Sequence, residues 1–86
     1  MSDLTQVTGR QIAAARSLVG MAQTDLAERS KVSIATLRRM EASVGPAAGM
    51  ANNVAAVQRA LEEAGVEFIA ENGGGPGVRL KKDRPA

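Results

Sequence analysis

Two short helical patterns lie almost end to end in the middle of this chain, and they constrain its fold more than any other feature. One covers residues 23–29 and the other residues 34–42, with a joint at residues 31–33 between them. Because the joint is so short, the two helices must meet close to it, and the small Ala27 stands where they would cross. Leu37 can then fix the second helix onto the first. The pattern predicts a pair of packed helices connected by a tight turn.

The remaining sequence predicts two more helices and then a change of period. Thr8 and Gln11 have the spacing of a capping box at the start of the first helix. After Gly65, β-branched and aromatic residues replace the helical spacing, and a Gly-rich run at 71–77 separates two short strands. The expected elements are helices over 8–20, 23–29, 34–42 and 53–64 and strands over 66–70 and 78–81. We therefore expect a mainly α fold of four helices followed by a C-terminal β-hairpin.

The absence of two residue types excludes several classes of function. The 86 residues include no Cys and no His, which excludes disulfides, the usual zinc sites, His-based triads and cysteine nucleophiles. We therefore expect no enzymatic activity, no metal and no cofactor. The longest uncharged stretch, 42–58, is too polar to span a membrane, and residues 1–7 do not have the pattern of a signal peptide. These features lead us to expect a cytoplasmic protein.

Basic residues are concentrated around the tight turn. The net charge is only +2, yet residues 29–39 contain four basic residues and no acidic ones. DNA affinity depends on such a local basic face, because each phosphate contact releases counterions. A solvated basic surface on an ordinary αα-hairpin is the alternative. Together with the turn, the charge favours a helix-turn-helix, whose second helix enters the major groove of DNA.

At these positions the sequence resembles the helix-turn-helix of the Xre/Cro, phage-repressor-like family of transcriptional regulators. The matching motifs are Ala15-Arg16, Gln23-x-x-Leu26-Ala27 and Val32-Ser33-x-x-Thr36-Leu37-x-x-Met40-Glu41. The resemblance covers residues 8–65, and the segment from Gly65 onward looks like the ending of small stand-alone bacterial members. Two positions depart from the family: Lys31 stands where Gly is usual in the turn, and Ala22 where a Ser or Thr cap is common. Lys31 would then accept a strain of roughly 1–2 kcal/mol, or the turn would be altered.

The resemblance implies a sequence-specific regulator, a dimeric repressor that reads the major groove of a two-fold DNA operator with the helix at 33–42. The implied DNA-binding residues are Gln23, Thr24, Ser33, Ile34, Ala35, Thr36, Arg38, Arg39 and Asn52. Gln23 matches a phosphate contact that also braces the third helix, and Ser33 matches a cap of the third helix that also contacts phosphate. Arg39 matches a base contact, where a guanidinium can bind guanine O6 and N7 together. Arg16 and Glu41 match a structural ion pair that ties the first helix to the end of the third.

The region before the fourth helix is the last part of the implied DNA interface. In the family this region lies near the DNA backbone. Asn52 and Asn53 are expected there, one capping the fourth helix and the other binding phosphate.

The C-terminal strands predict a homodimer. An isolated two-stranded hairpin is marginal in water, so it must pack on the helices, pair with a second hairpin, or both. Two copies joined at a strand edge would form one four-stranded sheet and hide the exposed edges. Such a dimer would also place two DNA-reading helices one turn of DNA apart, about 34 Å. The predicted dimerisation residues are Val66, Phe68, Val78 and Leu80.

The expected organisation is a helix-turn-helix domain at 1–65, with the motif at about 23–42, a hairpin at 66–81 and a flexible basic tail at 82–86. An alternative function stays open. The chain could be an antitoxin or another protein-interaction module with the same fold, although only the hairpin and the tail could wrap a partner.

Overall fold

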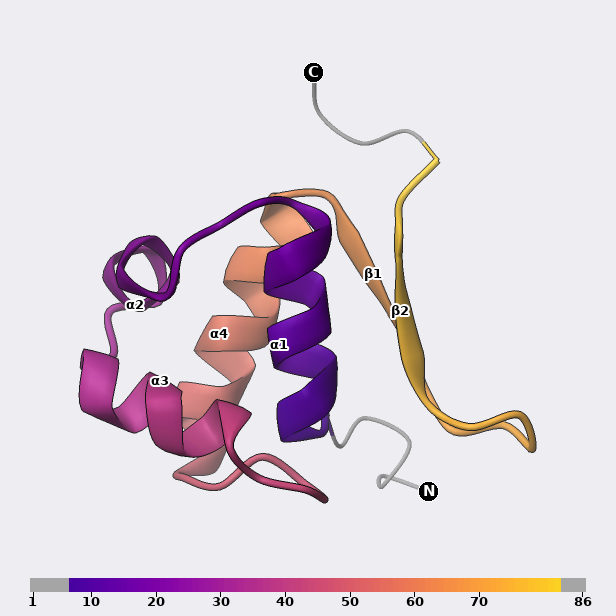
Figure 1. The fold of residues 1–86 in the computed structure, drawn as a ribbon, viewed down its shortest axis with the longest axis horizontal. Helices are drawn as coiled ribbons and strands as arrows, with labels where there is room; N and C mark the ends of the chain where they lie inside the picture. Colours follow the sequence, from indigo (N-terminus) through magenta and orange to yellow (C-terminus); the bar gives the residue numbers. More distant parts are fainter. Residues whose placement is uncertain (1–6, 83–86) are drawn as a thin grey trace.

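Four helices are followed by a two-stranded antiparallel hairpin (Figure 1). The computed structural model describes residues 7–82, so Lys82 is the only residue of the predicted basic tail within the described part. The elements are α1 (Gly9–Leu18), α2 (Gln23–Ser30), α3 (Ile34–Glu41), α4 (Ala51–Glu63), β1 (Val66–Ile69) and β2 (Gly77–Leu80). The expected mainly α fold with a C-terminal hairpin is confirmed. None of the helices within residues 7–82 is long and apolar enough to cross a membrane.

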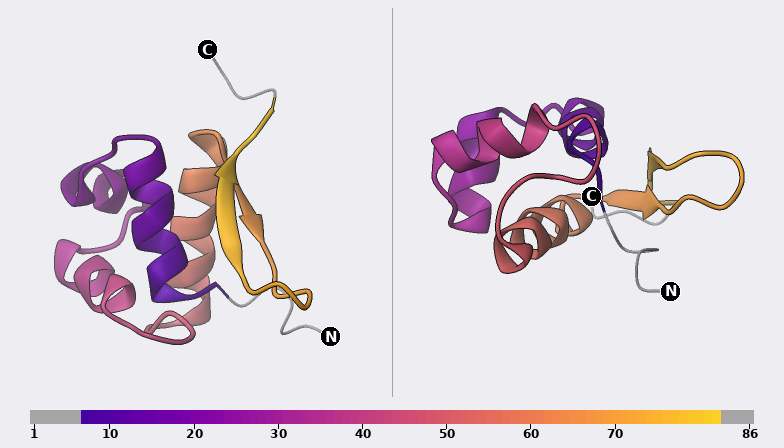
Figure 2. Two further views of the ribbon diagram at one scale, coloured as in Figure 1. Left: turned by 45° about the vertical axis from the view of Figure 1, so that its right-hand side comes forward. Right: turned by 90° about the horizontal axis from the view of Figure 1, so that it is seen from below.

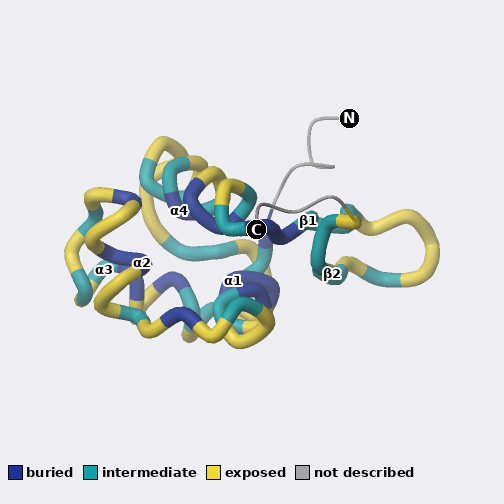
Figure 3. The backbone as a smooth tube through the Cα atoms, turned by 90° about the horizontal axis from the view of Figure 1, so that it is seen from above, coloured by how far each residue is buried: buried dark blue, intermediate teal, exposed yellow. Residues whose placement is uncertain are grey.

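The helices and the hairpin enclose one small core. The α2–α3 pair lies on one side of α1 and α4, and the hairpin lies on the other (Figures 1 and 2). α2 packs on α4, α3 on α1, β1 on α4 and β2 on α1. The largest fully buried side chains are Ile12, Leu26, Leu37, Met40, Val57, Leu61 and Val66. They come from every helix and from β1, so these elements depend on one another for burial, while the tip of the hairpin projects into solvent (Figure 3).

The helix boundaries near the tight turn follow their local chemistry. The Thr8 hydroxyl accepts the Gln11 N–H at 3.0 Å and the Gln11 side chain accepts the Thr8 N–H at 2.9 Å, so the capping box is present. Ser33 caps α3 by accepting the Thr36 N–H at 3.0 Å. Lys31 has φ 62° and ψ 37°, which is the left-handed conformation that the usual glycine would adopt. Of the two expected outcomes, Lys31 therefore accepts the strain.

The start of α4 differs from the prediction. The helix begins at Ala51, two residues before the predicted start at Asn53, and its N-cap is Met50, which has no side-chain cap. The Met50 carbonyl already accepts the Asn53 and Val54 N–H groups, each at 3.0 Å. The expected capping role for Asn52 or Asn53 is therefore wrong, since both lie inside the first turn. Alanine is a strong helix former, and its propensity allows the earlier start.

The hairpin is attached to the helices of its own chain. Val66 is fully buried, and Phe68 and Val78 pack against the core. The Gln11 side chain donates to the carbonyls of Ile69 and Gly77, at 3.3 and 2.9 Å. These contacts correct one part of the predicted dimer interface, because this apolar face covers α1 and α4 of the same chain. The strand edges remain for contact with a second copy.

Gly9 should be sensitive to even the smallest side chain. It is buried at the start of α1, and a Cβ there would meet Ser43 O at 2.5 Å and Ser43 N at 3.0 Å, with Met40 O closer still. Because backbone atoms cannot easily move aside, Gly9→Ala is expected to lower the free energy of unfolding by about 1–3 kcal/mol. Urea denaturation followed by circular dichroism measures this loss. Gly45→Ala is the matched control, since a Cβ at Gly45 meets nothing within 4 Å; equal midpoints for the two variants would contradict the prediction.

Candidate functional site

The outer side of α3 presents an exposed and basic surface. Ala35, Arg38 and Arg39 are exposed, while Leu37 and Met40 are fully buried on the opposite side. The three exposed residues are spaced by three and four positions, so their side chains share one helix face. Of the predicted DNA-binding residues, this group is the one that the structure brings together most clearly. We call it the α3 face.

The N-terminal turn of α3 is less open than predicted. The Ser33 hydroxyl accepts the Thr36 N–H and also donates to Thr36 Oγ1 at 2.9 Å, so the two hydroxyls are bonded to each other. Ile34 was expected on the exposed surface, and this expectation is wrong. It is half-buried and packs against the core, because it lies three residues before the buried Leu37 on the same side of the helix.

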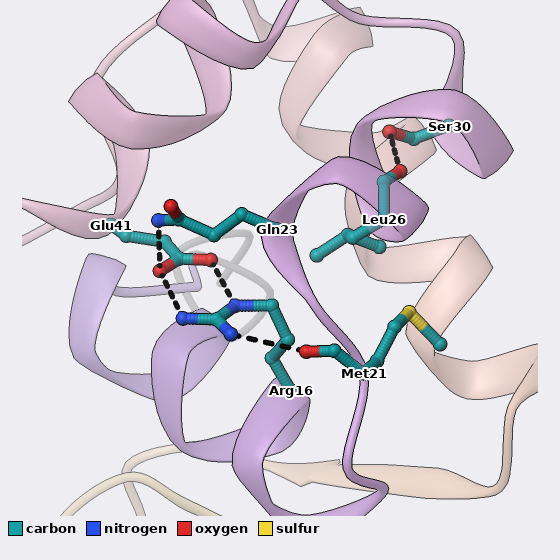
Figure 4. A network of polar contacts seen from close by, with 6 residues as sticks. All are labelled: Arg16, Met21, Gln23, Leu26, Ser30 and Glu41. Carbon is teal, nitrogen blue, oxygen red and sulfur yellow. Dashed lines mark hydrogen bonds and ion pairs between the residues drawn. The ribbon is translucent and has the colours of Figure 1, made fainter.

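A polar cluster holds the end of α3 against α1 and α2 (Figure 4). The Arg16 guanidinium donates to both carboxylate oxygens of Glu41, from Nε at 2.8 Å and from Nη2 at 3.0 Å. Its Nη1 donates to the Met21 carbonyl at 3.0 Å. Gln23, the first residue of α2, donates through Nε2 to Glu41 Oε1 at 3.0 Å. Glu41 is therefore the common acceptor that joins three helices.

The cluster is mostly shielded from water. The Glu41 side chain is 7% exposed and that of Arg16 is 22% exposed. The hydrogen bond to Glu41 raises the pKa of Arg16 above its ordinary value, although burial acts in the opposite direction. Arg16 therefore keeps its charge. A bidentate pair of this kind fixes the relative orientation of the two side chains as well as the distance between them. As a result, the contacts of Glu41 hold the α3 face in one orientation relative to the start of α2.

Two helix N-termini have no side-chain cap. Ala22 precedes α2 and Met50 precedes α4, and neither residue has a side chain that accepts a hydrogen bond from the first backbone N–H groups. Thr24 and Asn52, both exposed, lie in the first turns of these helices. Such N-termini attract anions because their N–H groups are unpaired and the helix dipole is positive there. At α2, Asp25 also lies in the first turn, and its charge competes with an external anion.

One basic group was missed by the sequence-based prediction. Arg59 of α4 lies with Arg29 and Lys31 around a hollow between α2 and α4. Arg29 and Lys31 belong to the basic run at residues 29–39, but no spacing in the sequence connects them to Arg59. Only the packing of α4 against α2 brings the three together.

In comparisons with known proteins, no family model and no curated protein matches this chain.

Proposed function

We propose that this chain is a sequence-specific DNA-binding regulator of transcription, a dimeric repressor whose α2 and α3 act as a helix-turn-helix of the Xre/Cro type. The observation that carries the proposal is the α3 face, an exposed basic surface on a short helix whose buried side is fixed to α1 and α2. A helix presented in this way fits the major groove of B-DNA, which is about 12 Å wide.

The residues of the α3 face differ in what they can read. Arg39 and Arg38 are exposed, and a guanidinium can donate two hydrogen bonds to guanine O6 and N7. Ala35 has no polar group but can contact a thymine methyl. Ser33 and Thr36 lie at the N-terminal turn. The Thr36 hydroxyl keeps its proton and can donate one further hydrogen bond to a phosphate or a base edge, whereas the Ser33 hydroxyl already donates its proton to Thr36 and can only accept one further bond.

Phosphate contacts at the α2 and α4 N-termini would position the α3 face. Gln23 and Thr24 lie at the uncapped start of α2, and Asn52 lies at the uncapped start of α4. Backbone contacts of this kind fix the register on the duplex and carry no sequence information. Gln23 has a second role in this proposal, because its hydrogen bond to Glu41 couples the α2 start to the end of α3.

The alternative function has one observation in its favour. Val44 and Met50, in the segment between α3 and α4, are 79% and 67% exposed. Exposed apolar side chains of this size suit a protein partner, as expected for an antitoxin or another interaction module. A stable protein that co-purifies with the chain and is lost in a Val44→Ser/Met50→Ser double variant would support this alternative.

The DNA proposal is tested by selecting binding sites from a library of random duplexes. We expect enriched sites with two-fold symmetry. Arg39→Ala is expected to weaken binding to the best site by about 1–3 kcal/mol and to relax the preference at one position in each half-site. Arg10→Ala is the matched control, since Arg10 is an exposed arginine of α1 outside the α3 face.

Three results of this experiment have different meanings. Relaxed preference at one position assigns Arg39 to a base. An equal loss of affinity on every duplex would make Arg39 a phosphate contact. If no duplex is enriched over the library, the proposed function is wrong.

A further inference from the structure

A small hollow lies between the last turn of α2 and the C-terminal half of α4, two helices that pack against each other. Its volume is about 250 Å³. Small residues leave this space open: Ser30 and Ala60 are buried there, and Ala56 is half-buried. We call this hollow the α2–α4 pocket.

The charged lining of the α2–α4 pocket is mainly basic. Arg29 and Lys31 come from the end of α2, Arg59 and Glu63 come from α4, and all four residues are exposed. Three positive charges and one negative charge give the lining a net charge of +2, which equals the net charge of the whole chain. The pocket therefore has a concentration of positive charge that the chain as a whole does not have.

The basic side chains of the pocket are unpaired within the described part of the chain. Asp25 precedes Arg29 by four residues and Arg59 precedes Glu63 by four, a spacing at which ion pairs form readily on helices. Neither pair is present among residues 7–82, where the ion pairs are Arg16–Glu41 and Glu67–Arg79. Lys31 likewise has no side-chain hydrogen bond to a described residue. The three cations remain available to a ligand.

Lys31 adds a second observation. Among residues 7–82 it is the one non-glycine residue with a positive φ. The left-handed conformation is strained for a residue with a Cβ, and strain of this kind is concentrated at ligand sites. A glycine would relieve the strain but would remove the ammonium group from the pocket.

We propose that the α2–α4 pocket is a binding site for a phosphate group. Arg29 and Arg59 can each offer two parallel N–H donors to phosphate oxygens, and Lys31 adds a compact positive charge. The volume is slightly below the ~300–1,000 Å³ of typical small-molecule pockets, which suits a phosphate with a short substituent. Glu63 favours a substituent that donates a hydrogen bond, such as a hydroxyl group.

This phosphate could belong to a nucleic-acid backbone or to a free phosphorylated small molecule. The pocket shares neither Arg38 nor Arg39 with the α3 face. Phosphate binding at the pocket is therefore independent of DNA recognition by the α3 face. Either proposal can fail while the other holds.

The test is an NMR titration of the full chain with inorganic phosphate at constant ionic strength. The chain has no Trp and no Tyr, so intrinsic fluorescence is not a suitable probe. We expect saturable shifts of the amides at 29–31 and 59–63 and of the two arginine Nε–H groups. Arg59→Gln is expected to weaken phosphate binding about five- to tenfold, Glu63→Gln to strengthen it, and Arg10→Gln to leave it unchanged.

Lys31→Gly separates a binding role from a structural one. Relief of the left-handed strain should raise the melting temperature, while loss of the ammonium group should weaken phosphate binding. Lys31→Ala retains the strain and should weaken binding without the gain in stability. Arg29→Gln serves as a second exposed variant on the α2 side if Arg59→Gln is unstable.

A second titration identifies the source of the phosphate. If a DNA duplex shifts the pocket signals and competes with inorganic phosphate, the ligand is a backbone phosphate. If inorganic phosphate still binds to the DNA-saturated chain, the ligand is a free phosphorylated molecule. Shifts that do not saturate, that chloride reproduces, or that Arg59→Gln leaves unchanged would overturn the proposal.

Discussion

Replacing Glu41 with alanine is expected to lower the free energy of unfolding by about 2–4 kcal/mol. Removing one partner of a buried pair costs about 3–5 kcal/mol because the other charge is left unpaired. The value expected here is somewhat smaller, since Arg16 is 22% exposed and water can replace part of the lost contact. Glu41→Ala also removes the acceptor of the Gln23 amide. Chemical denaturation followed by circular dichroism measures the change.

The hairpin supplies a control with the same chemistry at the surface. Glu67 and Arg79 also form a bidentate pair, but their side chains are 46% and 64% exposed. The Arg79 hydrogen bond lowers the pKa of Glu67. The contribution of this pair is therefore present above the ordinary carboxyl range and is lost as the pH falls through the lowered pKa. Glu67→Ala should change stability far less than Glu41→Ala, because exposed pairs contribute little.

A double-mutant cycle attributes the loss to the pair itself. If Arg16 and Glu41 stabilise the fold mainly through each other, the double alanine variant should lose less stability than the sum of the two single variants. Simple additivity would mean that each residue acts through separate contacts, such as the Arg16 bond to the Met21 carbonyl. Equal effects of Glu41→Ala and Glu67→Ala would contradict the importance assigned to burial.

Features with a local cause could be predicted from the sequence. The Thr8–Gln11 capping box, the Ser33 cap and the strand pairing across the Gly-rich turn each depend on residues close in sequence or on a simple alternation. The exposed positions of Arg38 and Arg39 followed from the buried positions of their neighbours Leu37 and Met40. The spacing of apolar residues therefore predicted most of the fold and the central part of the candidate site.

Features that depend on packing between distant segments could not be predicted in this way. Gln11 bonds to carbonyls of both strands as well as to Thr8, and nothing in its local sequence indicates the second role. The first turn of α4 formed without a capping side chain, so the preference of Asn for caps gave the wrong start. Arg59 joins the α2–α4 pocket only because α4 packs on α2.

The remaining large prediction concerns the hairpin edges. β1 and β2 pair only with each other in the described part of the chain, so each has one edge without a strand partner. Exposed edges invite pairing with another strand. Leu80 is half-buried and lies outside the set of apolar side chains that form or cover the core. We expect two copies to pair at a strand edge near Leu80 and to form one four-stranded sheet.

Leu80→Glu should therefore convert the dimer into a monomer, as measured by light scattering. A monomer contacts one half-site, so affinity for a two-fold operator should fall by roughly 10²–10⁴ as the tethering of two half-sites is lost. Deleting the hairpin would be a poorer test, because Val66 is fully buried and its removal would open the core. Val44→Glu is the matched control: it places the same charge on an exposed apolar residue outside the hairpin.

Amide hydrogen exchange of the wild-type chain tests the same interface without a substitution. In an edge-paired dimer, outward-facing N–H groups of one strand become hydrogen-bonded, so their protection should increase with protein concentration. The N–H groups of successive strand residues point to opposite sides, so the Arg79 N–H, next to Leu80, faces β1 inside the hairpin. Its exchange should therefore depend little on protein concentration. A Leu80→Glu chain that still dimerises, combined with edge amides that exchange equally at all concentrations, would place the dimer interface on the helices. The hairpin would then serve only to cover α1 and α4.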